Sequence, residues 1–131
     1  TPNFIAGATY TPALEFAAMT FDEEVVENER KMVAYLYEKL KSIEGMRIYG
    51  ERCGEKIPVF SFSIDGVHHE DMALLLDKMG VAVRSGMMCA EPLMTRFGVT
   101  GMVRASLAPY NTLQECDIFI EALKKAVSML R

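Results

Sequence analysis

The amino-acid sequence predicts an α/β fold of the two-layer α+β type, in which helices cover one face of a small, mainly antiparallel sheet. Short apolar runs with strand character alternate along the chain with longer segments whose apolar residues recur at helical spacing. The 131 residues, 50% of them hydrophobic and 24% charged, suffice for one compact domain with its own core. Such elements bury their apolar sides by packing a helical layer on a sheet.

The first twenty residues are predicted to stand apart from that domain. Residues 1–8 are expected to form a loop, and the segment from Tyr10 to Met19 a helix with little polar surface. Such a helix requires burial on several sides. We therefore expect the sequence to be part of something larger, with a second domain or another subunit covering this helix.

A long helix and two strands are predicted next. Thr20 and Glu23 have the spacing of a capping box, and the apolar positions of the helix continue to Ile43. Residues 46–49 have the character of a short strand. Residues 59–64 alternate bulky and small side chains, which is typical of a half-buried strand.

The second half of the chain continues the alternation of helices and strands. A helix is predicted from Glu70 to Met79, a third strand from Val81 to Arg84 and a fourth over residues 102–107. The last helix begins with a capping box of Thr112 and Glu115. Its apolar stripe comprises Cys116, Phe119, Ile120, Leu123, Val127 and Leu130.

Cys89 is predicted to lie in an exposed loop between a strand end and a helix start. Pro92 opens that helix, because proline favours the first helical position. Backbone N–H groups and the helix dipole at this place favour a thiolate. Arg84 and Arg104 would add positive charge if the fold brings them near. We predict a reactive Cys89, the alternative being an inert loop cysteine.

Composition and charge narrow the function classes. The formal net charge of −4 argues against nucleic acid or an anionic membrane as a partner. No apolar run approaches the roughly 20 residues of a membrane span, and the chain shows no secretory pattern.

His68 and His69 are predicted to start a helix and not to bind a metal, because no third ligand stands at metal spacing.

The three cysteines are scattered along the chain. Cys53, Cys89 and Cys116 provide neither a disulfide framework nor a paired metal motif, which predicts a reducing cytosol as the setting. We expect Cys116 to lie in the core, on the apolar stripe of the last helix, and Cys53 to be a surface thiol.

A compound motif with ordered spacing runs through the second half of the chain. It comprises Gly80 to Ala90, then Pro92-Leu93-Met94, then Val103 to Leu107 with Tyr110-Asn111-Thr112. Together with Thr1-Pro2-Asn3, these segments resemble the group II cysteine desulfurase and selenocysteine lyase family, whose members mobilise sulfur for iron–sulfur cluster assembly. The resemblance spans nearly the whole chain.

The resemblance implies the aspartate-aminotransferase-like fold of pyridoxal-phosphate enzymes, with a large cofactor domain and a small C-terminal domain. Residues 1–20 would be the tail of the large domain and residues 21–131 the small domain. None of the lysines here has the sequence context of the family's Schiff-base lysine. We therefore expect the chain alone to be inactive and the parent enzyme to be a pyridoxal-phosphate-dependent homodimer in the cytoplasm.

The resemblance also implies roles for single residues. Cys89 matches the nucleophile that takes sulfur from L-cysteine, or selenium from selenocysteine, to leave alanine and a persulfide. Arg104 matches the arginine that pairs with the substrate carboxylate. Arg84 is expected to bind substrate or anchor the cysteine loop because of its own position, at the strand end that leads into that loop. Thr1 matches a threonine that reaches the cofactor phosphate of the other subunit.

Several alternatives stay open at this point. Met87 and Met88 stand where the family commonly carries one or two histidines, so the proton-transfer role of those histidines is unassigned here. Arg104 could be a surface arginine, and Arg84 could form a structural salt bridge. The rival function is a non-enzymatic α/β module that binds a partner or carries sulfur on Cys89. As an enzyme, the protein would instead pass its sulfur to an acceptor protein.

Overall fold

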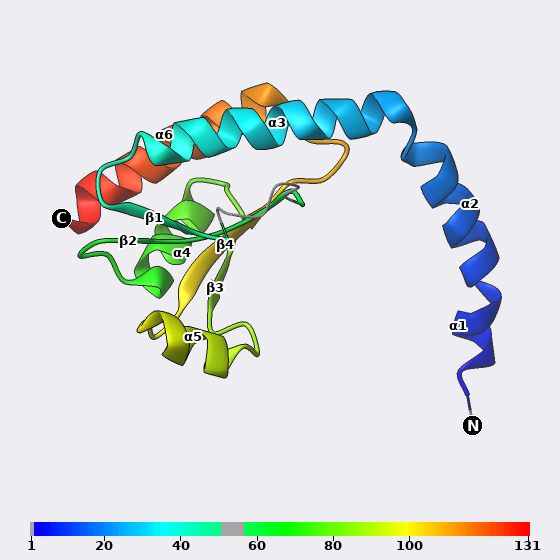
Figure 1. Ribbon diagram of the computed structural model, residues 1–131, viewed down its shortest axis with the longest axis horizontal. Coiled ribbons are helices and arrows are strands. Elements are labelled where there is room, and N and C mark those ends of the chain that lie inside the picture. Colours follow the sequence, from blue (N-terminus) through cyan, green and yellow to red (C-terminus); the bar gives the residue numbers. More distant parts are fainter. Residues whose placement is uncertain (1, 51–56) are drawn as a thin grey trace.

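The structure, a computed structural model, describes residues 2–50 and 57–131 and places a helical layer against a four-stranded antiparallel sheet of order β1-β2-β4-β3 (Figure 1). The predicted fold class is confirmed. The strands are β1 (Met46–Tyr49), β2 (Val59–Ile64), β3 (Arg84–Gly86) and β4 (Met102–Ser106). The helices are α1 (Phe4–Ala8), α2 (Tyr10–Thr20), α3 (Glu23–Lys41), α4 (His69–Lys78), α5 (Glu91–Phe97) and α6 (Leu113–Leu130).

Alternation along β2 determines which face of the sheet is the core. Phe60 and Phe62 are fully buried, whereas Ser61 between them is partly exposed. Phe62 pairs with Val103 of β4 and Phe60 with Ala105, so apolar side chains from both strands share one face. Helices α3, α4 and α6 cover this face. The helix residues in the same buried cluster include Leu36, Leu40, Met72, Leu76, Ile120 and Leu123.

The short helix α5 packs on the other face of the sheet (Figure 1). Met102 neighbours Val103 in β4 and therefore points to the opposite side. There it forms a second, smaller buried cluster with Tyr49 of β1 and Met94 of α5. The sheet thus has one face under a thick helical layer and one face that only α5 and its flanking loops cover in part.

The predicted capping box at Thr20 is wrong, whereas the one at Thr112 is confirmed. Asp22 is the N-cap of α3, since its carboxylate accepts a hydrogen bond from the N–H of Val25 at 2.9 Å. Thr20 ends α2, where its hydroxyl donates to a backbone carbonyl one turn earlier. Thr112 and Glu115 cap α6 reciprocally, with N–H to oxygen distances of 3.2 and 2.8 Å.

The third strand begins later than predicted. Val81 was expected to start it, but the Val81 N–H donates to the carbonyl of Leu76 at 2.9 Å and so takes part in ending α4. Val81 and Val83 pack against the core without pairing in the sheet. The strand β3 is instead Arg84–Gly86, which pairs with β4 alone. Apolar alternation predicted the burial of this segment correctly but not its hydrogen bonding.

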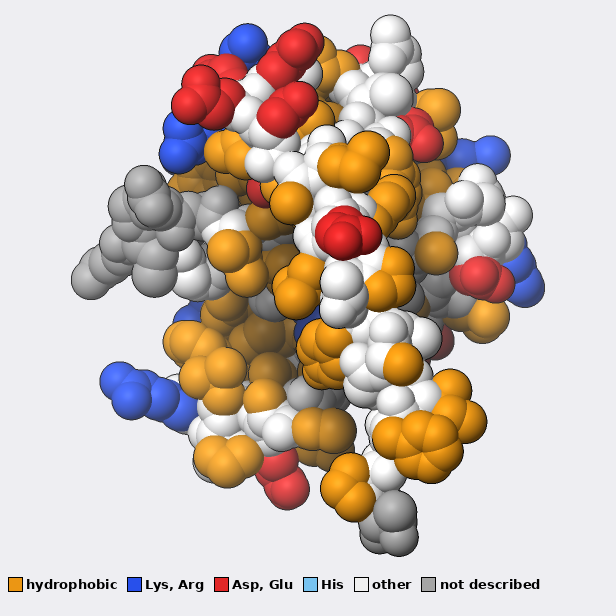
Figure 2. Space-filling view, turned by 90° about the vertical axis from the view of Figure 1, so that its right-hand side faces the viewer, with side chains coloured by type: hydrophobic (Ala, Val, Ile, Leu, Met, Phe, Trp, Pro, Cys, Tyr) orange, Lys and Arg blue, Asp and Glu red, His pale blue; other side chains and the backbone are white. Residues whose placement is uncertain are grey.

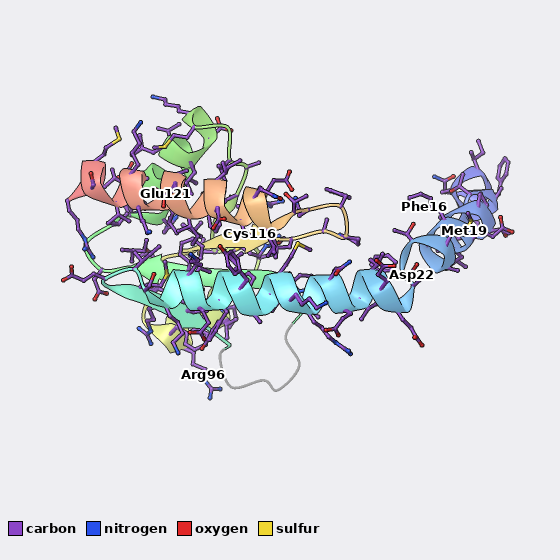
Figure 3. The ribbon with its side chains drawn as sticks, turned by 90° about the horizontal axis from the view of Figure 1, so that it is seen from above. Phe16, Met19, Asp22, Arg96, Cys116 and Glu121 are labelled. Carbon is purple, nitrogen blue, oxygen red and sulfur yellow. The ribbon has the colours of Figure 1, made fainter. Side chains whose placement is uncertain are left out.

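Residues 2–20 form a helical arm that projects from the rest of the molecule (Figures 1 and 3). The predicted loop over residues 1–8 is wrong from Phe4 onward, because α1 forms there. Asn3 is its N-cap, and the Asn3 side chain accepts a hydrogen bond from the N–H of Ala6 at 3.0 Å. Neither α1 nor α2 has a buried residue, although large apolar side chains line the arm (Figure 2). The most exposed of them are Phe4, Ile5, Tyr10, Leu14, Phe16 and Met19.

The histidine pair starts α4, as predicted. The Nδ1 atom of His68 accepts from the N–H of Glu70 at 3.4 Å in the N-cap position. The ring of His69 lies so close to Gly101 that a Cβ added there would overlap the ring. The Nδ1 atom of His69 is buried without a hydrogen-bond partner. Burial lowers the pKa of His69 below its ordinary value, and His68 adds to this effect against the opposing charge of Glu70 and Asp71.

We predict that this histidine makes the folded chain less stable in mild acid. Below about pH 6.5 the unfolded chain takes up a proton that folded His69 resists, so the free energy of unfolding decreases as pH falls through that value. Urea unfolding between about pH 5 and pH 8 measures the slope. His69→Gln should flatten it more than His68→Gln does. Equal slopes in the wild type and His69→Gln would contradict the assignment.

Gly45 and Gly66 both require positive φ angles, of 74° and 76°, but only Gly45 is crowded. A Cβ at Gly45 would lie 2.5 Å from the guanidinium of Arg131 and 3.2 Å from Asp65, whereas Gly66 has nothing within 4 Å. The same guanidinium donates to the carbonyls of Glu44 at 3.0 Å and Asp65 at 3.2 Å. The end of α6 is thereby tied to two loops of the sheet.

Substituting alanine at these two glycines separates backbone strain from crowding. Gly66→Ala should cost about 1 kcal/mol of unfolding free energy, because it forces a Cβ into the left-handed region. Gly45→Ala should cost about 1 kcal/mol more, because Arg131 must also give up hydrogen bonds to make room. Urea denaturation measures both, and equal losses would show that the Arg131 contacts add nothing.

Candidate functional site

Cys89 lies in a tight turn between β3 and α5, and its side chain is exposed. Met88 and Cys89 have φ angles of 52° and 58°, and the N–H of Ala90 donates to the carbonyl of Met87 at 2.9 Å. Two positive φ angles inside a four-residue turn closed this way are typical of type I′. Residues other than glycine, asparagine and aspartate seldom adopt this conformation, so surrounding structure must hold it.

Both neighbours of Cys89 are anchored while Cys89 itself faces solvent. Met88 and Ala90 pack against the cluster of Tyr49, Met94 and Met102 on the α5 face of the sheet. Met87, the first residue of the turn, is 47% exposed. The turn therefore presents its thiol outward from an apolar base.

Arg84 and Arg104 lie directly opposite each other on β3 and β4. Such cross-strand neighbours have Cβ atoms about 4.5–5.5 Å apart and share one face of the sheet. Because Val103 and Ala105 occupy the core face, the two arginines lie on the other face of the sheet. The Cys89 turn and α5 pack on that same face. Like charges in this arrangement repel each other unless an anion binds between them.

The Arg104 guanidinium carries an unsatisfied buried donor. Its Nε atom is buried and has no hydrogen-bond partner. In the described part of the chain the ion pairs are Arg30 with Glu27 and Lys124 with Glu121, so neither arginine of the site has an acidic partner there. An unsatisfied buried donor is costly, and a carboxylate can satisfy a guanidinium through two parallel hydrogen bonds. The arginine pair is thus suited to bind a small carboxylate.

The site face lacks a described lysine. All the lysines in the ranges 2–50 and 57–131 belong to the helices of the opposite layer, namely Lys31, Lys39, Lys41, Lys78, Lys124 and Lys125. Cysteine and two arginines fit the sulfur and the carboxylate of an amino acid. They do not supply the amine with which pyridoxal phosphate forms an imine. Thr1 and Cys53, singled out from the sequence, lie outside the described residues.

Outside the site face, the structure has few features that suggest a further functional site. Cys116 is buried in α6, as predicted, and burial raises the pKa of its thiol. A pocket of about 320 Å³ beside His68 and His69 is lined by β2, α4 and the connection from α5 to β4. Within the described ranges, no group of three His, Cys, Asp or Glu side chains is placed to hold a metal, and no helix is both long and apolar enough to span a membrane.

The sequence analysis identified Cys89, Arg84 and Arg104 but not Tyr49. Tyr49 is 8% exposed and belongs to the cluster that supports the Cys89 turn. Its only sequence signal is an aromatic residue at the end of a short strand, which does not indicate which face or which loop it supports.

The amino-acid sequence of this chain is similar to those of one protein family. Residues 1–119 match the family model of aminotransferase class-V. A probable cysteine desulfurase of Xylella fastidiosa (strain Temecula1) is 42% identical over 130 residues, which cover 99% of this chain and 31% of that protein. The cysteine desulfurase CsdA of Escherichia coli (strain K12) is 38% identical over 131 residues, covering 99% of this chain and 32% of that protein.

Solved structures agree with the sequence relatives. The crystal structure of Escherichia coli CsdA matches 100% of this chain with a TM-score of 0.88 and 35% identity, using 32% of its own length. A cysteine desulfurase structure from Thermococcus onnurineus matches 79% of this chain with a TM-score of 0.72 and 36% identity. The chain spans about a third of the length of the curated relatives it matches. With most of its residues inside the family model, the chain belongs to the aminotransferase class-V family.

Proposed function

We propose that this chain is the nucleophile-bearing part of a pyridoxal-phosphate-dependent cysteine desulfurase. The observation that carries the proposal is an exposed Cys89 turn arising beside two arginines, Arg84 and Arg104, that have no acidic partner among the described residues. Similarity to proteins named cysteine desulfurases supports the reaction class. The whole enzyme would release alanine from L-cysteine and leave a persulfide on Cys89.

In this proposal the arginine pair binds and orients the substrate. The guanidinium of Arg104 accommodates the two oxygens of the amino-acid carboxylate, and Arg84 opposite it adds a second positive charge. A substrate held by its carboxylate has few remaining orientations, so its sulfur can be directed to one place. Fixing both partners in this way replaces a collision between free molecules with a step inside one complex.

Cys89 then receives the sulfur. Its thiolate attacks the Sγ atom of the substrate, an S–S bond forms, and the Cβ–Sγ bond of the substrate breaks. The electron pair of that bond stays on the carbon side, where a proton completes the methyl group of alanine. L-Cysteine and the Cys89 thiol thus give L-alanine and a Cys89 persulfide, without an external oxidant. Pyridoxal phosphate, which residues outside this described part would hold, would supply the electron sink that makes the bond cleavable.

Further aspects of the proposal extend beyond this chain. Selenocysteine would use the same carboxylate clamp and thiol, with selenium in place of sulfur. The persulfide on the exposed Cys89 would pass to an acceptor protein and serve iron–sulfur cluster assembly in a reducing cytosol. Thr1 would contribute to the cofactor phosphate of a partner subunit. The apolar arm of α1 and α2 would be covered by the remainder of the enzyme and its homodimer partner.

Cys89→Ser in the full-length enzyme tests the nucleophile. The variant should keep the absorbance band of the bound cofactor but form no persulfide and release no alanine in a single turnover, because the hydroxyl cannot accept sulfur. Cys116→Ser is the matched control for loss of a thiol, since Cys116 is buried in the core layer away from the site face. Undiminished persulfide formation by Cys89→Ser would sink the proposal.

Arg104→Gln tests the carboxylate clamp. The variant should raise KM for L-cysteine by about tenfold to a hundredfold, as expected for a lost charge-assisted bidentate pair. Arg96→Gln removes the same charge from α5, where the side chain is exposed and projects outward (Figure 3), and should change KM little. Steady-state kinetics measure both. Equal effects of the two substitutions would indicate general charge attraction and not a clamp.

A further inference from the structure

We propose that Tyr49 is a positioning residue for Cys89, holding the nucleophile turn through the apolar cluster on the α5 face of the sheet. This inference rests on the proposed function. Tyr49 comes from β1, the strand at the opposite edge of the sheet from β3, after which the turn begins. The tyrosine therefore supports the turn from a part of the chain that is distant in sequence.

Tyr49 is itself held on several sides. Its ring is 8% exposed and lies 4.9 Å from the ring of Phe97 of α5, centroid to centroid, at a tilt of 53°. Its hydroxyl shares a hydrogen bond of 2.9 Å with the hydroxyl of Ser63 on β2. The guanidinium of Arg47 stands 5.0 Å from the ring centroid. A ring fixed by a neighbouring ring, a hydrogen bond and a cation is a rigid base for whatever packs on it.

The turn packs on the buried cluster to which this ring belongs. Met88 and Ala90, the two neighbours of Cys89, contact the cluster that Tyr49 forms with Met94 and Met102. Consecutive positive φ angles at Met88 and Cys89 are unfavourable for the isolated chain. In the described structure, the packing of the Met88 and Ala90 side chains offsets this conformational cost. Loss of the Tyr49 ring should therefore loosen the turn at Cys89.

The position of Tyr49 separates this role from substrate binding. In the register of the sheet, Tyr49 pairs with Ser61 on β2, and Ser61 pairs with Arg104 on β4. A whole strand thus lies between the tyrosine and the arginine pair. Removing the ring should misplace the thiol while leaving the carboxylate clamp intact, which predicts a change in kcat and not in KM.

The test uses the full-length enzyme with Tyr49→Leu, Tyr49→Phe and the control Tyr35→Leu. Tyr35 also has a hydrogen-bonded hydroxyl, 2.6 Å from Asp117, but it lies on α3 in the opposite layer. Tyr49→Leu should lower kcat for alanine release by about tenfold or more with KM unchanged, as expected for a misplaced reacting group. Tyr49→Phe keeps the ring and should restore most of the rate, and Tyr35→Leu should leave both constants unchanged.

Hydrogen exchange supplies a readout besides activity. In Tyr49→Leu the amide of Ala90, which closes the turn, should exchange about tenfold faster or more, with the β2 and β4 amides unchanged. A role confined to overall stability would instead raise exchange throughout the sheet. If Tyr49→Leu does not fold, Phe97→Leu removes the other ring of the pair and is read in the same way.

The outcomes are distinct. Unchanged kcat and unchanged Ala90 exchange in Tyr49→Leu would overturn the positioning role, as would faster exchange spread over the whole sheet. A wild-type enzyme that releases no alanine would overturn the proposed function instead, and the exchange measurement would still report whether Tyr49 holds the turn.

Discussion

The antiparallel pairing of β4 between β2 and β3 is the constraint on which the rest of the structure depends. It places Val103 and Ala105 beside the phenylalanines of β2, so that one face becomes the core under α3, α4 and α6. The same register sets Arg104 opposite Arg84 on the other face. One set of backbone hydrogen bonds therefore produces both the hydrophobic core and the cationic pair, because side chains alternate strictly along a strand.

The site combines features that are unfavourable on their own. Two arginines face each other without a described acidic partner, and a methionine and a cysteine adopt backbone angles better suited to glycine. Such departures from local preference tend to gather at functional sites, where packing elsewhere offsets them. Here the Tyr49 cluster supports the turn, and in the proposed function a substrate carboxylate relieves the repulsion between the arginines. In that proposal the substrate carboxylate and the reactive thiol would lie at adjacent parts of one sheet face.

The apolar arm and the arginine pair have a common explanation in the proposed function. Both are surfaces that the described chain leaves incomplete, one apolar and one charged. The chain spans about a third of its curated relatives, and in a whole enzyme the remaining two thirds would cover the arm and bring the cofactor to the arginines. Parts of the enzyme outside this chain would then shield the charged site from water, so this chain need not enclose the site by itself.

The sequence by itself determined the fold class, the capped helix at Thr112, the burial of Cys116 and the exposed position of Cys89, because these depend on local patterns of apolar residues, caps and proline. It misplaced the cap at Thr20, because Asp22 caps α3 instead, and the start of the strand at Val81, because the Val81 N–H bonds to Leu76 at the end of α4. Only the tertiary structure decided that Arg84 faces Arg104 and that Tyr49 joins the cluster against which the Cys89 turn packs, because strand register and the packing of distant residues are not encoded in any local window.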